Sequence, residues 1–569
     1  MKQNLMMWLF TGLFGVLSAE MLNSYSKPLG EMDGFYRYTA VLGPLLSKGH
    51  RLREIPQWML ETDFPYAKRP YDQEIPFADG LSVVRLLGGW EDKKLPEDRQ
   101  NDPNDLVFRD EDGRLQYRWN LLKDRLDPFV THGYSDLTLV MDNVPWCFPV
   151  TPVIGGFGQV APPADYNEWY TFIRDMCREL KRLYGEETVK NFSFRMGTEM
   201  QDHRRFSGSF EEYLKYYDFA AKAVMEEIPT AGFGPFNRSM PMSAKEKKEI
   251  PYDLVDILDV IQHCVSGTNY ATGQIGSPIT FVARSFYYFS SQPGPGVFSN
   301  IHPDQRTPEQ GELWRQALAI KPGLSREVHE LGPHLNTEEN LYGLDTGARG
   351  AAQTLHTLIN FKEEGAGRLW HWELFEDITT DKALLLGQGW LYSVMDHMRG
   401  GNIFSLPVKS SKENTGKALL SVKDKKAVIA TALWNVDREK TGADTIELFI
   451  PADLFATHKP SIKYLSFNEE NSVYDVIRRD LKENGLLSEK HLAHRGAPAT
   501  IAVSAYHQMA SNKAHGKWFI EDNWEKYEQL MRASLKLSAF TGNIKNSTDG
   551  IRISIEVKNP SVTIIILEN

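Results

Sequence analysis

The sequence predicts an α/β protein in which a (β/α)8 TIM barrel, residues 20–400, precedes a β-sandwich domain, residues 401–569. From about residue 80 to residue 400, short apolar runs alternate with longer amphipathic ones, which is typical of strand and helix units around a mainly parallel sheet. About eight such units can be placed, and eight units favour a closed barrel. Beyond residue 400 the runs are short, β-rich and bounded by turn residues, as in a β-sandwich.

The N-terminal residues 1–19 have the pattern of a secretory signal peptide. Lys2 precedes an apolar run at 5–17, and the small residues Ser18 and Ala19 suit cleavage. This run is short for crossing a bilayer, which disfavours an uncleaved anchor. We therefore expect a secreted or periplasmic protein without membrane contact after cleavage.

The composition excludes several classes of protein. Lys and Arg number 64 against 75 Asp and Glu, and the net charge of -11 argues against a nucleic-acid partner. The 3 cysteines, Cys147, Cys177 and Cys264, are too few and too scattered for a disulfide framework or a zinc site. We expect no metal or other cofactor, and the sequence does not indicate the oligomeric state.

Strands and helices alternate through the expected barrel. Buried strands are predicted at 81–90 and 137–146, and the helix between them is stopped by Gly133. A further strand is predicted at 192–199. Later units follow the same apolar pattern, with strands at 230–236, 279–290, 324–332 and 367–375 and a helix at 347–365.

Capping signals delimit two of the barrel helices. One helix starts after Asp165, which can form a capping box with Glu168, and ends at Gly185. The other begins with Ser209 and Glu212, which form a second capping box. Within the C-terminal domain, residues 518–539 look helical and do not fit a β-sandwich, so the sequence gives them no place.

Glu199 is the first candidate catalytic residue. In the strand 192–199, Ser193, Arg195, Gly197 and Glu199 share the polar side, which would line the barrel interior. Glu199 would then lie at the carboxyl end of its strand, where barrel enzymes place their active sites. A helix-entry role near the next helix's positive end also remains open. A metal site shared with His203 would require a helix, which Gly197 disfavours.

A second acidic position ends the strand at 324–332. Glu327 and Glu330 are separated by an odd number of residues, so in a regular strand only one of them reaches the barrel mouth. We favour Glu330 because Gly332 and Pro333 end the strand just beyond it. Two carboxylates at different strand ends suit glycosidic cleavage, in which one protonates the leaving oxygen and the other attacks the anomeric carbon or activates water.

Aromatic and basic residues near strand ends are candidate contacts for a sugar. Flat apolar rings suit the C–H faces of a sugar, although large aromatics also simply fill cores; the candidates are Trp90, Trp146, Trp370 and Trp372. Glu373, Glu376 and Asp377 are more simply explained as polar lining. The run of His203, Arg204 and Arg205 could bind a sulfate or carboxylate, or could be a solvated loop.

These segments, in this order, resemble the clan A glycoside hydrolases, and especially family 39, the β-xylosidase and α-iduronidase group. The likeness spans roughly residues 80 to 400. It is carried by "VVRLLGGW" as the second strand, by "LQYRWNLLKDRLDPFVTHGYSDLTLVMDNVPW" as the third unit, and by "YNEWYTFIRDMCRELKRLYGEETVKNFSFRMGTE" as the fourth helix and strand.

The resemblance implies a role for individual residues. Glu199 matches the clan's acid/base and Glu330, in "VHELG", matches its nucleophile. Arg85 matches the arginine of the second strand, and Trp372 matches the tryptophan that forms part of the sugar-binding floor. The clan's Asn-Glu-Pro reads Thr198-Glu199-Met200 here, and the replaced asparagine normally contacts the 2-hydroxyl of the sugar.

We therefore expect a secreted or periplasmic retaining glycosidase that acts on poly- or oligosaccharides from chain ends. Catalysis would rest on Glu199 and Glu330, and substrate binding on Arg85, Trp146, Thr198, His203, Arg204 and Trp372. The altered motif leaves two alternatives: an exo-hydrolase of sulfated algal galactans, similar to the family 167 carrageenan enzymes, and a carbohydrate-binding pseudoenzyme.

Overall fold

The computed structural model describes most of the two expected domains. The described residues are 26–32, 37–41, 80–90, 95–130, 136–156, 158–238, 244–287, 303–332, 347–371, 376–379, 382–385, 387–437, 440–456, 460–486 and 513–569. The predicted signal peptide, 1–19, lies outside them. None of the helices in these ranges is both long and apolar enough to cross a membrane.

Eight parallel strands form a TIM-barrel-like ring. In the order of the chain they are β2 (Arg37–Val41), β3 (Gly80–Val84), β6 (Asp136–Val140), β7 (Ser193–Thr198), β8 (Gly232–Asn237), β9 (Phe281–Tyr287), β10 (Ser325–Gly332) and β11 (Arg368–His371). Each strand pairs with its neighbour in the chain, except that β8 and β9 form the two edges of the sheet, and β11 pairs with β2. Between β8 and β9, Thr280 N donates to Phe233 O (2.8 Å) and Ser285 N donates to Arg238 O (3.2 Å). These hydrogen bonds join the two edges of the sheet.

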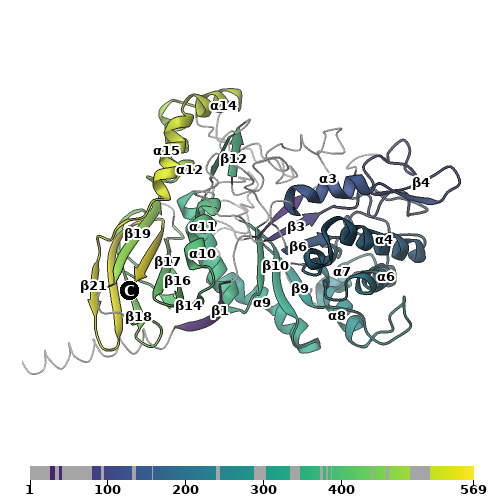
Figure 1. Ribbon diagram of the computed structural model, residues 1–569, viewed down its shortest axis with the longest axis horizontal. Helices are drawn as coiled ribbons and strands as arrows, with labels where there is room; N and C mark the ends of the chain where they lie inside the picture. The colour runs from purple at the N-terminus through teal and green to yellow at the C-terminus, as the bar shows by residue number, and fades with distance from the viewer. Residues whose placement is uncertain are drawn as a thin grey trace, which may run out of the picture.

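Helices follow the strands and cover the outside of the ring (Figure 1). They are α3 (Trp119–Val130), α4 (Tyr166–Tyr184), α6 (Phe210–Glu227), α8 (Ile257–Ser266), α9 (Pro303–Ile320), α10 (Ala348–Glu363) and α11 (Gly387–Met395). Shorter elements lie in the connections: the hairpin β4 (Val107–Arg109) and β5 (Leu115–Tyr117), α5 (Glu186–Val189), α7 (Ala244–Glu249), the hairpin β12 (Glu376–Thr379) and β13 (Lys382–Leu385), and the 3-10 helix η3 (Asp396–Met398).

The capping residues explain where two helices begin. The Asp165 carboxylate accepts hydrogen bonds from Asn167 N and Glu168 N, which confirms it as the cap of α4. The Glu168 side chain does not complete a capping box, because it forms an ion pair with Arg109 instead. At α6 the capping box of Ser209 and Glu212 is present in both directions.

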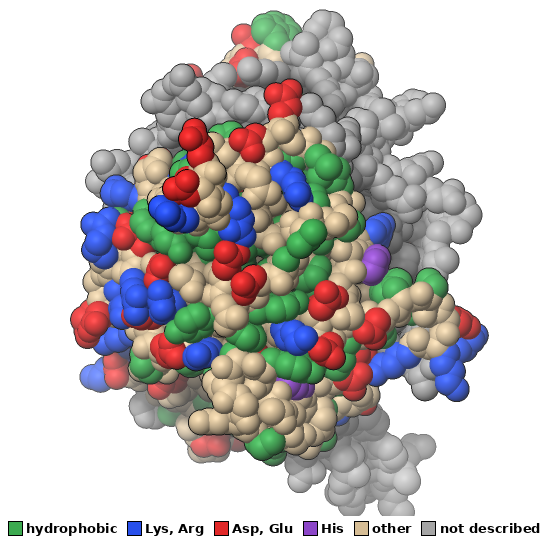
Figure 2. Space-filling model, turned by 90° about the vertical axis from the view of Figure 1, so that its right-hand side faces the viewer, with side chains coloured by type: hydrophobic (Ala, Val, Ile, Leu, Met, Phe, Trp, Pro, Cys, Tyr) green, Lys and Arg blue, Asp and Glu red, His purple; other side chains and the backbone are tan. Residues whose placement is uncertain are grey.

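The outer helices carry both signs of charge. Arg178 and Lys181 of α4 bridge Glu227 of α6 at 2.7 and 2.8 Å. Figure 2 shows acidic and basic side chains interspersed over this face of the molecule, with no large area of one sign. An extended basic surface of the kind that binds nucleic acid is therefore missing from this face.

Two antiparallel sheets form the C-terminal domain. The larger sheet runs β1 (Lys27–Glu31), β14 (Asn402–Pro407), β16 (Thr415–Lys423), β17 (Lys426–Trp434), β23 (Ser561–Glu568), β19 (Ser461–Asn468) and β20 (Ser538–Ala539). The smaller sheet runs β15 (Lys409–Ser410), β18 (Gly442–Pro451), β22 (Gly550–Asn559) and β21 (Asn543–Asn546). An apolar cluster that includes Ile429, Ile446 and Ile553 joins their facing sides.

The larger sheet is covered on both faces. In β23, Ile565 and Leu567 belong to the cluster shared with the smaller sheet, whereas Ile564 and Ile566 belong to the main core. Helix α10 packs on this second face against β17 and β23, between the barrel and the sheets (Figure 1). Burial on both faces explains why "TIIIL" in β23 is a continuous apolar run instead of an alternating one.

Two features differ from the expected domain division. Strand β1 lies within the expected barrel range of 20–400, yet it pairs with β14 of the C-terminal sheet. Its five residues are mostly exposed and carry no apolar pattern, so this pairing has no signal in the sequence. The unplaced helical segment at 518–539 forms the end of α14 (Lys513–Asp522) and α15 (Trp524–Ser534), and α15 packs against β13, β19 and α12 (Val473–Glu483).

Helix α10 has an almost wholly buried surface, and its first turn is capped from the other domain. Every residue of α10 except Arg349 and Glu363 is buried. Gly347 precedes it without a capping side chain, and Ala348 N donates to Asp475 Oδ2 of α12 at 2.9 Å. This carboxylate therefore satisfies one of the helix's unpaired N–H groups.

We predict that Asp475→Ala destabilises the protein by about 1 kcal/mol, as the loss of an N-cap does. The reason is that the N–H of Ala348 would lose its acceptor, while the rest of the fold would be unchanged. The midpoint of denaturant unfolding measures the effect. Asp453→Ala, at an exposed aspartate of the same domain, is the matched control. An equal loss of stability in both variants would contradict the capping role.

Candidate active site

Strained backbone marks the carboxyl ends of three adjacent barrel strands. Arg85 (φ 63), Asn143 (φ 30) and Glu199 (φ 50) follow β3, β6 and β7, and they are three of the five non-glycine residues with positive φ in the described part of the chain. Such conformations cost free energy and cluster at functional sites. The strained residues therefore lie at the carboxyl ends of the barrel strands, where the sequence also predicts the two candidate carboxylates.

Strand β7 turns its polar side into the ring, as the alternation predicts. The side chain of Arg195 is fully buried and lies close to His329 of β10. The alternation breaks at Gly197, which has φ 88, and a side chain there would collide with Met200. As a result Thr198 also faces the interior, where its hydroxyl accepts a hydrogen bond from Arg195 Nη2 (2.8 Å).

Glu199 lies just past the end of β7 and is partly exposed. Ser285 Oγ of β9 donates to its Oε1 at 2.9 Å. Arg205 Nη2 is 3.8 Å from its Oε2, and the side chains of Arg205 and Glu199 are 23% and 26% exposed. The carboxylate therefore has one buried hydrogen-bond donor on one oxygen and a cation beside the other.

Glu330 is buried, at 3% exposure, at the end of β10. Its Oε1 accepts a hydrogen bond from Asn237 Nδ2 of β8 at 2.8 Å. A register shift between Val328 and Glu330 interrupts the pairing with β9. This irregularity explains why Glu327 also lies in the ring interior, below Glu330, although a regular strand would turn the two glutamates to opposite faces.

Three hydrogen bonds join the two candidate carboxylates. Asn237 Nδ2 donates both to Glu330 Oε1 and to Ser285 Oγ, each at 2.8 Å, and Ser285 Oγ donates to Glu199 Oε1 at 2.9 Å. The two carboxylate oxygens cannot be farther apart than the summed length of these three bonds. That length is below ~9.5 Å, the widest carboxyl separation of inverting glycosidases.

Arg85 is a buried cation that interacts electrostatically with Glu330. Its backbone N donates to Asp142 Oδ1 at 2.7 Å. Burial and the neighbouring Arg205 lower the pKa of Arg85 to about 9, while Asp142 and Glu330 act in the opposite direction. Arg85 therefore remains a cation at neutral pH beside the predicted nucleophile, in keeping with its predicted place in the site.

The Thr198 hydroxyl makes two hydrogen bonds to the protein. It accepts from Arg195 Nη2 and donates to Asp142 Oδ2 at 2.7 Å. A hydroxyl has a single hydrogen, so Thr198 has none left to donate to a sugar. The predicted contact between Thr198 and substrate is therefore limited to its one remaining lone pair, and Thr198 instead ties β7 to β6.

The other predicted binding residues are in different situations. Trp146 is fully buried, and its backbone N donates to Asp105 at 2.6 Å. His203 is exposed and lies against Tyr252, with ring centroids 4.7 Å apart. Arg204 is 81% exposed and pairs with Asp202 at 2.6 Å. Trp372 lies outside the described residues.

Sequence reasoning missed the residues that connect the carboxylates. Asn237, Ser285 and Asp142 each lie within two residues of the end of a barrel strand, as Glu199 and Glu330 do. That position was the available signal, but the apolar neighbours in "GFGPFN" and "ARSFYY" concealed it. Arg205, and not Arg204, is the basic residue of the "HRR" run that lies beside Glu199.

The suggested metal site with His203 does not form. The backbone at 199–205 is turn and bend instead of helix, and His203 contacts Tyr252. Throughout the described ranges, no group of three or more His, Cys, Asp or Glu side chains is arranged to hold a metal ion.

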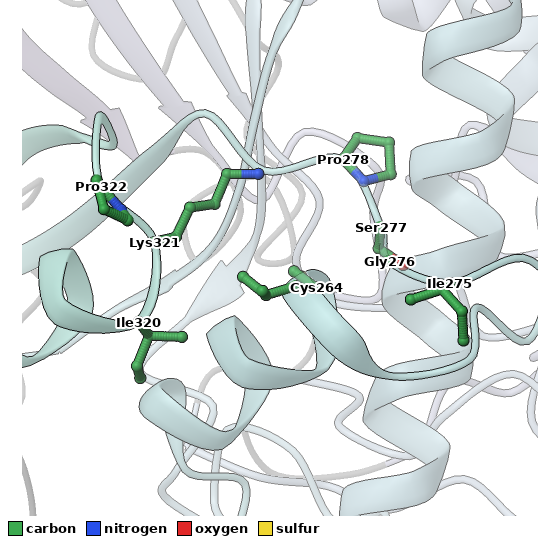
Figure 3. Close-up of a pocket in the computed structure, with 9 residues that line it drawn as sticks. Cys264, Ile275, Gly276, Ser277, Pro278, Ile320, Lys321 and Pro322 are labelled. Carbon is green, nitrogen blue, oxygen red and sulfur yellow. The ribbon is translucent and has the colours of Figure 1, made fainter.

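Figure 3 shows a separate hollow beside α8 and the segments that enter β9 and β10. It has a volume of about 450 Å³ and is lined by residues of α8 and of the segments that enter β9 and β10, among them Cys264, Pro278 and Pro322. These segments precede the strands, whereas both candidate carboxylates lie at the carboxyl ends of theirs. The hollow is therefore remote from the candidate active site.

Part of the chain matches the model of a known family of enzymes. Residues 102–316 match the family model "Glycosyl hydrolases family 39". The chain resembles the glycosyl hydrolases of family 39. This likeness covers the third to the sixth strand of the ring and therefore includes Glu199, Asn237 and Ser285. Glu330 lies beyond the matched range.

Two curated relatives match parts of the chain. An α-1,4-L-rhamnosidase of Formosa agariphila is 28% identical over 164 residues, which are 27% of this chain and 33% of that protein. A β-xylosidase of Caldicellulosiruptor saccharolyticus is 28% identical over 133 residues, 22% of this chain and 26% of that protein. The matches thus span about a third or less of each relative's own length.

Solved structures of family 39 enzymes share the fold over nearly the whole chain. A GH39 enzyme from Xanthomonas axonopodis pv. citri has a TM-score of 0.58 at 12% identity, covering 96% of both chains. A bacterial orthologue of human α-L-iduronidase has a TM-score of 0.62 at 13% identity, covering 96% of this chain and 82% of that one. A monomeric β-xylosidase from Caulobacter crescentus has a TM-score of 0.56 at 14% identity, covering 96% and 98%.

A buried histidine, His329, lies beneath the candidate carboxylates. Arginine only donates hydrogen bonds, so Nδ1 of His329 accepts from Arg195 Nη1 (3.0 Å), and its Nε2–H donates to Glu327 Oε2 (2.7 Å). His329 is therefore neutral. Burial lowers its pKa to about 4, with Arg195 acting in the same direction and Glu327 opposing them.

We predict that acidification destabilises the protein between pH 6.5 and pH 4. In this window His329 binds a proton in the unfolded chain but stays neutral in the folded protein. The free energy of unfolding therefore decreases as the pH is lowered from 6.5 to 4, by up to about 3 kcal/mol. His329→Gln keeps one acceptor and one donor but cannot titrate, and should lose most of this pH dependence in thermal unfolding. His203→Gln, at an exposed histidine, should retain it. Matching pH profiles for His329→Gln and the wild type would contradict the assignment.

Proposed function

We propose that this protein is a retaining glycosidase in which Glu199 is the acid/base and Glu330 the nucleophile. The observation that carries the proposal is the hydrogen-bonded path from Glu199 through Ser285 and Asn237 to Glu330, which keeps the carboxylates within the separations used for glycosidic cleavage. The likeness to family 39 supports the reaction class. In keeping with it, we assign the two domains to a (β/α)8 barrel and a β-sandwich.

The mechanism follows from the positions of the two glutamates. Glu330 attacks the anomeric carbon while Glu199 gives its proton to the departing glycosidic oxygen, so that the C–O bond breaks and a glycosyl-enzyme ester forms. Glu199, now ionised, takes a proton from water, whose oxygen attacks the anomeric carbon and releases Glu330. Arg205 at 3.8 Å stabilises the Glu199 carboxylate that proton donation leaves behind.

Arg85 and Asn237 act on the nucleophile. The Asn237 amide donates to one oxygen of Glu330 and leaves the other for the sugar. The buried Arg85 cation favours the ionised form of Glu330, which is the form that attacks. A binding protein would have no need of this arrangement, so we favour an enzyme over a carbohydrate-binding pseudoenzyme.

The substrate is proposed from the relatives and from the charges at the site. The relatives suggest terminal rhamnose, xylose or uronic acid units. An acidic or sulfated sugar, as in algal galactans, is favoured by one observation: Arg205 and Arg85 place two cations beside the carboxylate pair. A panel of 4-nitrophenyl glycosides of these sugars, together with sulfated galactan oligosaccharides, tests these classes directly.

Export is also proposed, from the pattern of residues 1–19. The mass of the protein recovered from an expressing bacterial host shows whether the signal peptide has been cleaved. A mature chain that begins at about residue 20 in the periplasm or the medium is the expected result. An uncleaved chain in the membrane fraction would favour the anchor instead.

We predict that Glu330→Ala abolishes turnover and that azide partly restores it. Azide can occupy the space of the missing carboxylate and attack the anomeric carbon in a single displacement, which gives a glycosyl azide of inverted configuration. Glu199→Ala should instead form a glycosyl-enzyme from aryl glycosides, and azide should then give the retained configuration. NMR spectra of the two azide products distinguish them.

Two results would overturn the proposed function. Wild-type protein that hydrolyses no glycoside of the panel would favour the pseudoenzyme. Hydrolysis by the wild type that persists in Glu330→Ala without azide would exclude Glu330 as the nucleophile. Glu327→Gln, which alters the neighbouring buried glutamate that does not reach Asn237, is the control for damage to β10.

A further inference from the structure

We propose that Asn237 and Ser285 are positioning residues that determine which oxygen of Glu199 carries the transferable proton. The inference rests on the proposed function, because it concerns the acid step of the same reaction. It goes beyond the two catalytic roles by assigning the proton to Oε2 of Glu199 and by naming the side chains that keep it there.

The direction of each hydrogen bond in the path is fixed by chemistry. An ionised carboxylate only accepts, so Glu330 requires the amide nitrogen of Asn237 and not its carbonyl oxygen. The same nitrogen lies 2.8 Å from Ser285 Oγ and gives its second hydrogen to it. Ser285 has one hydrogen of its own, and this hydrogen goes to Glu199 Oε1.

The orientation of the amide has a cost that supports this assignment. The Oδ1 atom of Asn237 is buried and has no hydrogen-bond partner among the described residues. A buried unpaired carbonyl is unfavourable, so an amide free to choose would turn this oxygen toward a donor. The two acceptors, Glu330 and Ser285, hold the nitrogen in place in spite of that cost.

The consequence concerns the two oxygens of Glu199. Oε1 accepts a hydrogen bond from Ser285 Oγ, on the side of Glu199 that faces the buried path. A proton on Oε1 would leave Ser285 facing two donors, Asn237 and Glu199, with no described acceptor for its own hydrogen. The acid proton therefore belongs on Oε2, the oxygen that lies toward Arg205.

Both positioning residues are buried and lie on strands, which restricts their movement. Asn237 and Ser285 are fully buried. They belong to β8 and β9, which are joined by backbone hydrogen bonds around Arg238, between Arg238 N and Ala283 O and between Ser285 N and Arg238 O. The path to Glu199 is therefore built on strands, which hold a catalytic side chain more accurately than a loop does.

The test uses leaving groups that differ in their need for a proton. Ser285→Ala should lower kcat/KM by about ten- to a hundredfold for methyl or oligosaccharide substrates, since an alkoxide leaves poorly without acid catalysis. With 4-nitrophenyl glycosides of the same sugar, the decrease should be about threefold or less, because nitrophenolate departs without a proton. Ser285→Thr retains the hydroxyl and should restore the wild-type ratio between the two substrates.

Further variants separate the two positioning residues. Asn237→Ala removes the donor to Glu330 as well, so it should slow both classes of substrate. Asn237→Asp should be slower still, because it places a second carboxylate against Glu330. Ser193→Ala, at a buried serine on the opposite end of β7 that accepts from Arg368, is the matched control and should leave the ratio unchanged.

The outcomes distinguish this inference from the proposed function. An equal decrease for both substrates in folded Ser285→Ala, or no decrease, would overturn the positioning role while leaving the glycosidase intact. A wild type without activity on any glycoside would remove the proposed function itself. If Ser285→Ala fails to fold, Ser285→Cys keeps the size of the side chain with a weaker donor. It should shift the substrate ratio in the same direction by a smaller factor, and an unshifted ratio would overturn the positioning role.

Discussion

The buried guanidinium of Arg195 is the constraint on which the active-site end of the barrel depends. A fully buried cation is tolerated only where hydrogen-bond acceptors surround it. Arg195 finds them in Gly197 O, in the hydroxyl of Thr198 and in Nδ1 of His329. Each contact fixes something else: the turn that ends β7, the orientation of the residue before Glu199, and the neutral tautomer of a histidine on β10.

A second layer of polar groups rests on this one, and the two layers have different tasks. The lower layer, which includes Arg195, His329 and Glu327, is closed to solvent and links β7 to β10 across the interior of the ring. The upper layer contains Glu199, Ser285, Asn237 and Glu330, and only Glu199 among them has substantial exposure. The structure thus separates groups that hold the site from groups that can react.

The sequence predicted those features that depend on local patterns. Asp165 and Ser209 could be identified as helix caps because a cap requires only residues within one turn. Glu199 could be placed near a strand end because the residues before it alternate between polar and apolar as far as Gly197. The features that it could not predict depend on distant parts of the chain. Ser285 and Asn237 meet only where the ring closes, and the irregularity in β10 has no sequence signal.

The placement of α10 also limits how this chain can be divided. One face of the helix completes the barrel, and the other forms part of the core beneath the larger sheet, to which the N-terminal strand β1 also contributes. A cut at residue 400 would therefore expose the apolar face of α10 and the face of the larger sheet that covers it, and it would separate β1 from its partner β14. The C-terminal domain therefore supplies one of the surfaces that cover α10. Recombination with another accessory module would have to preserve the same helix-binding face.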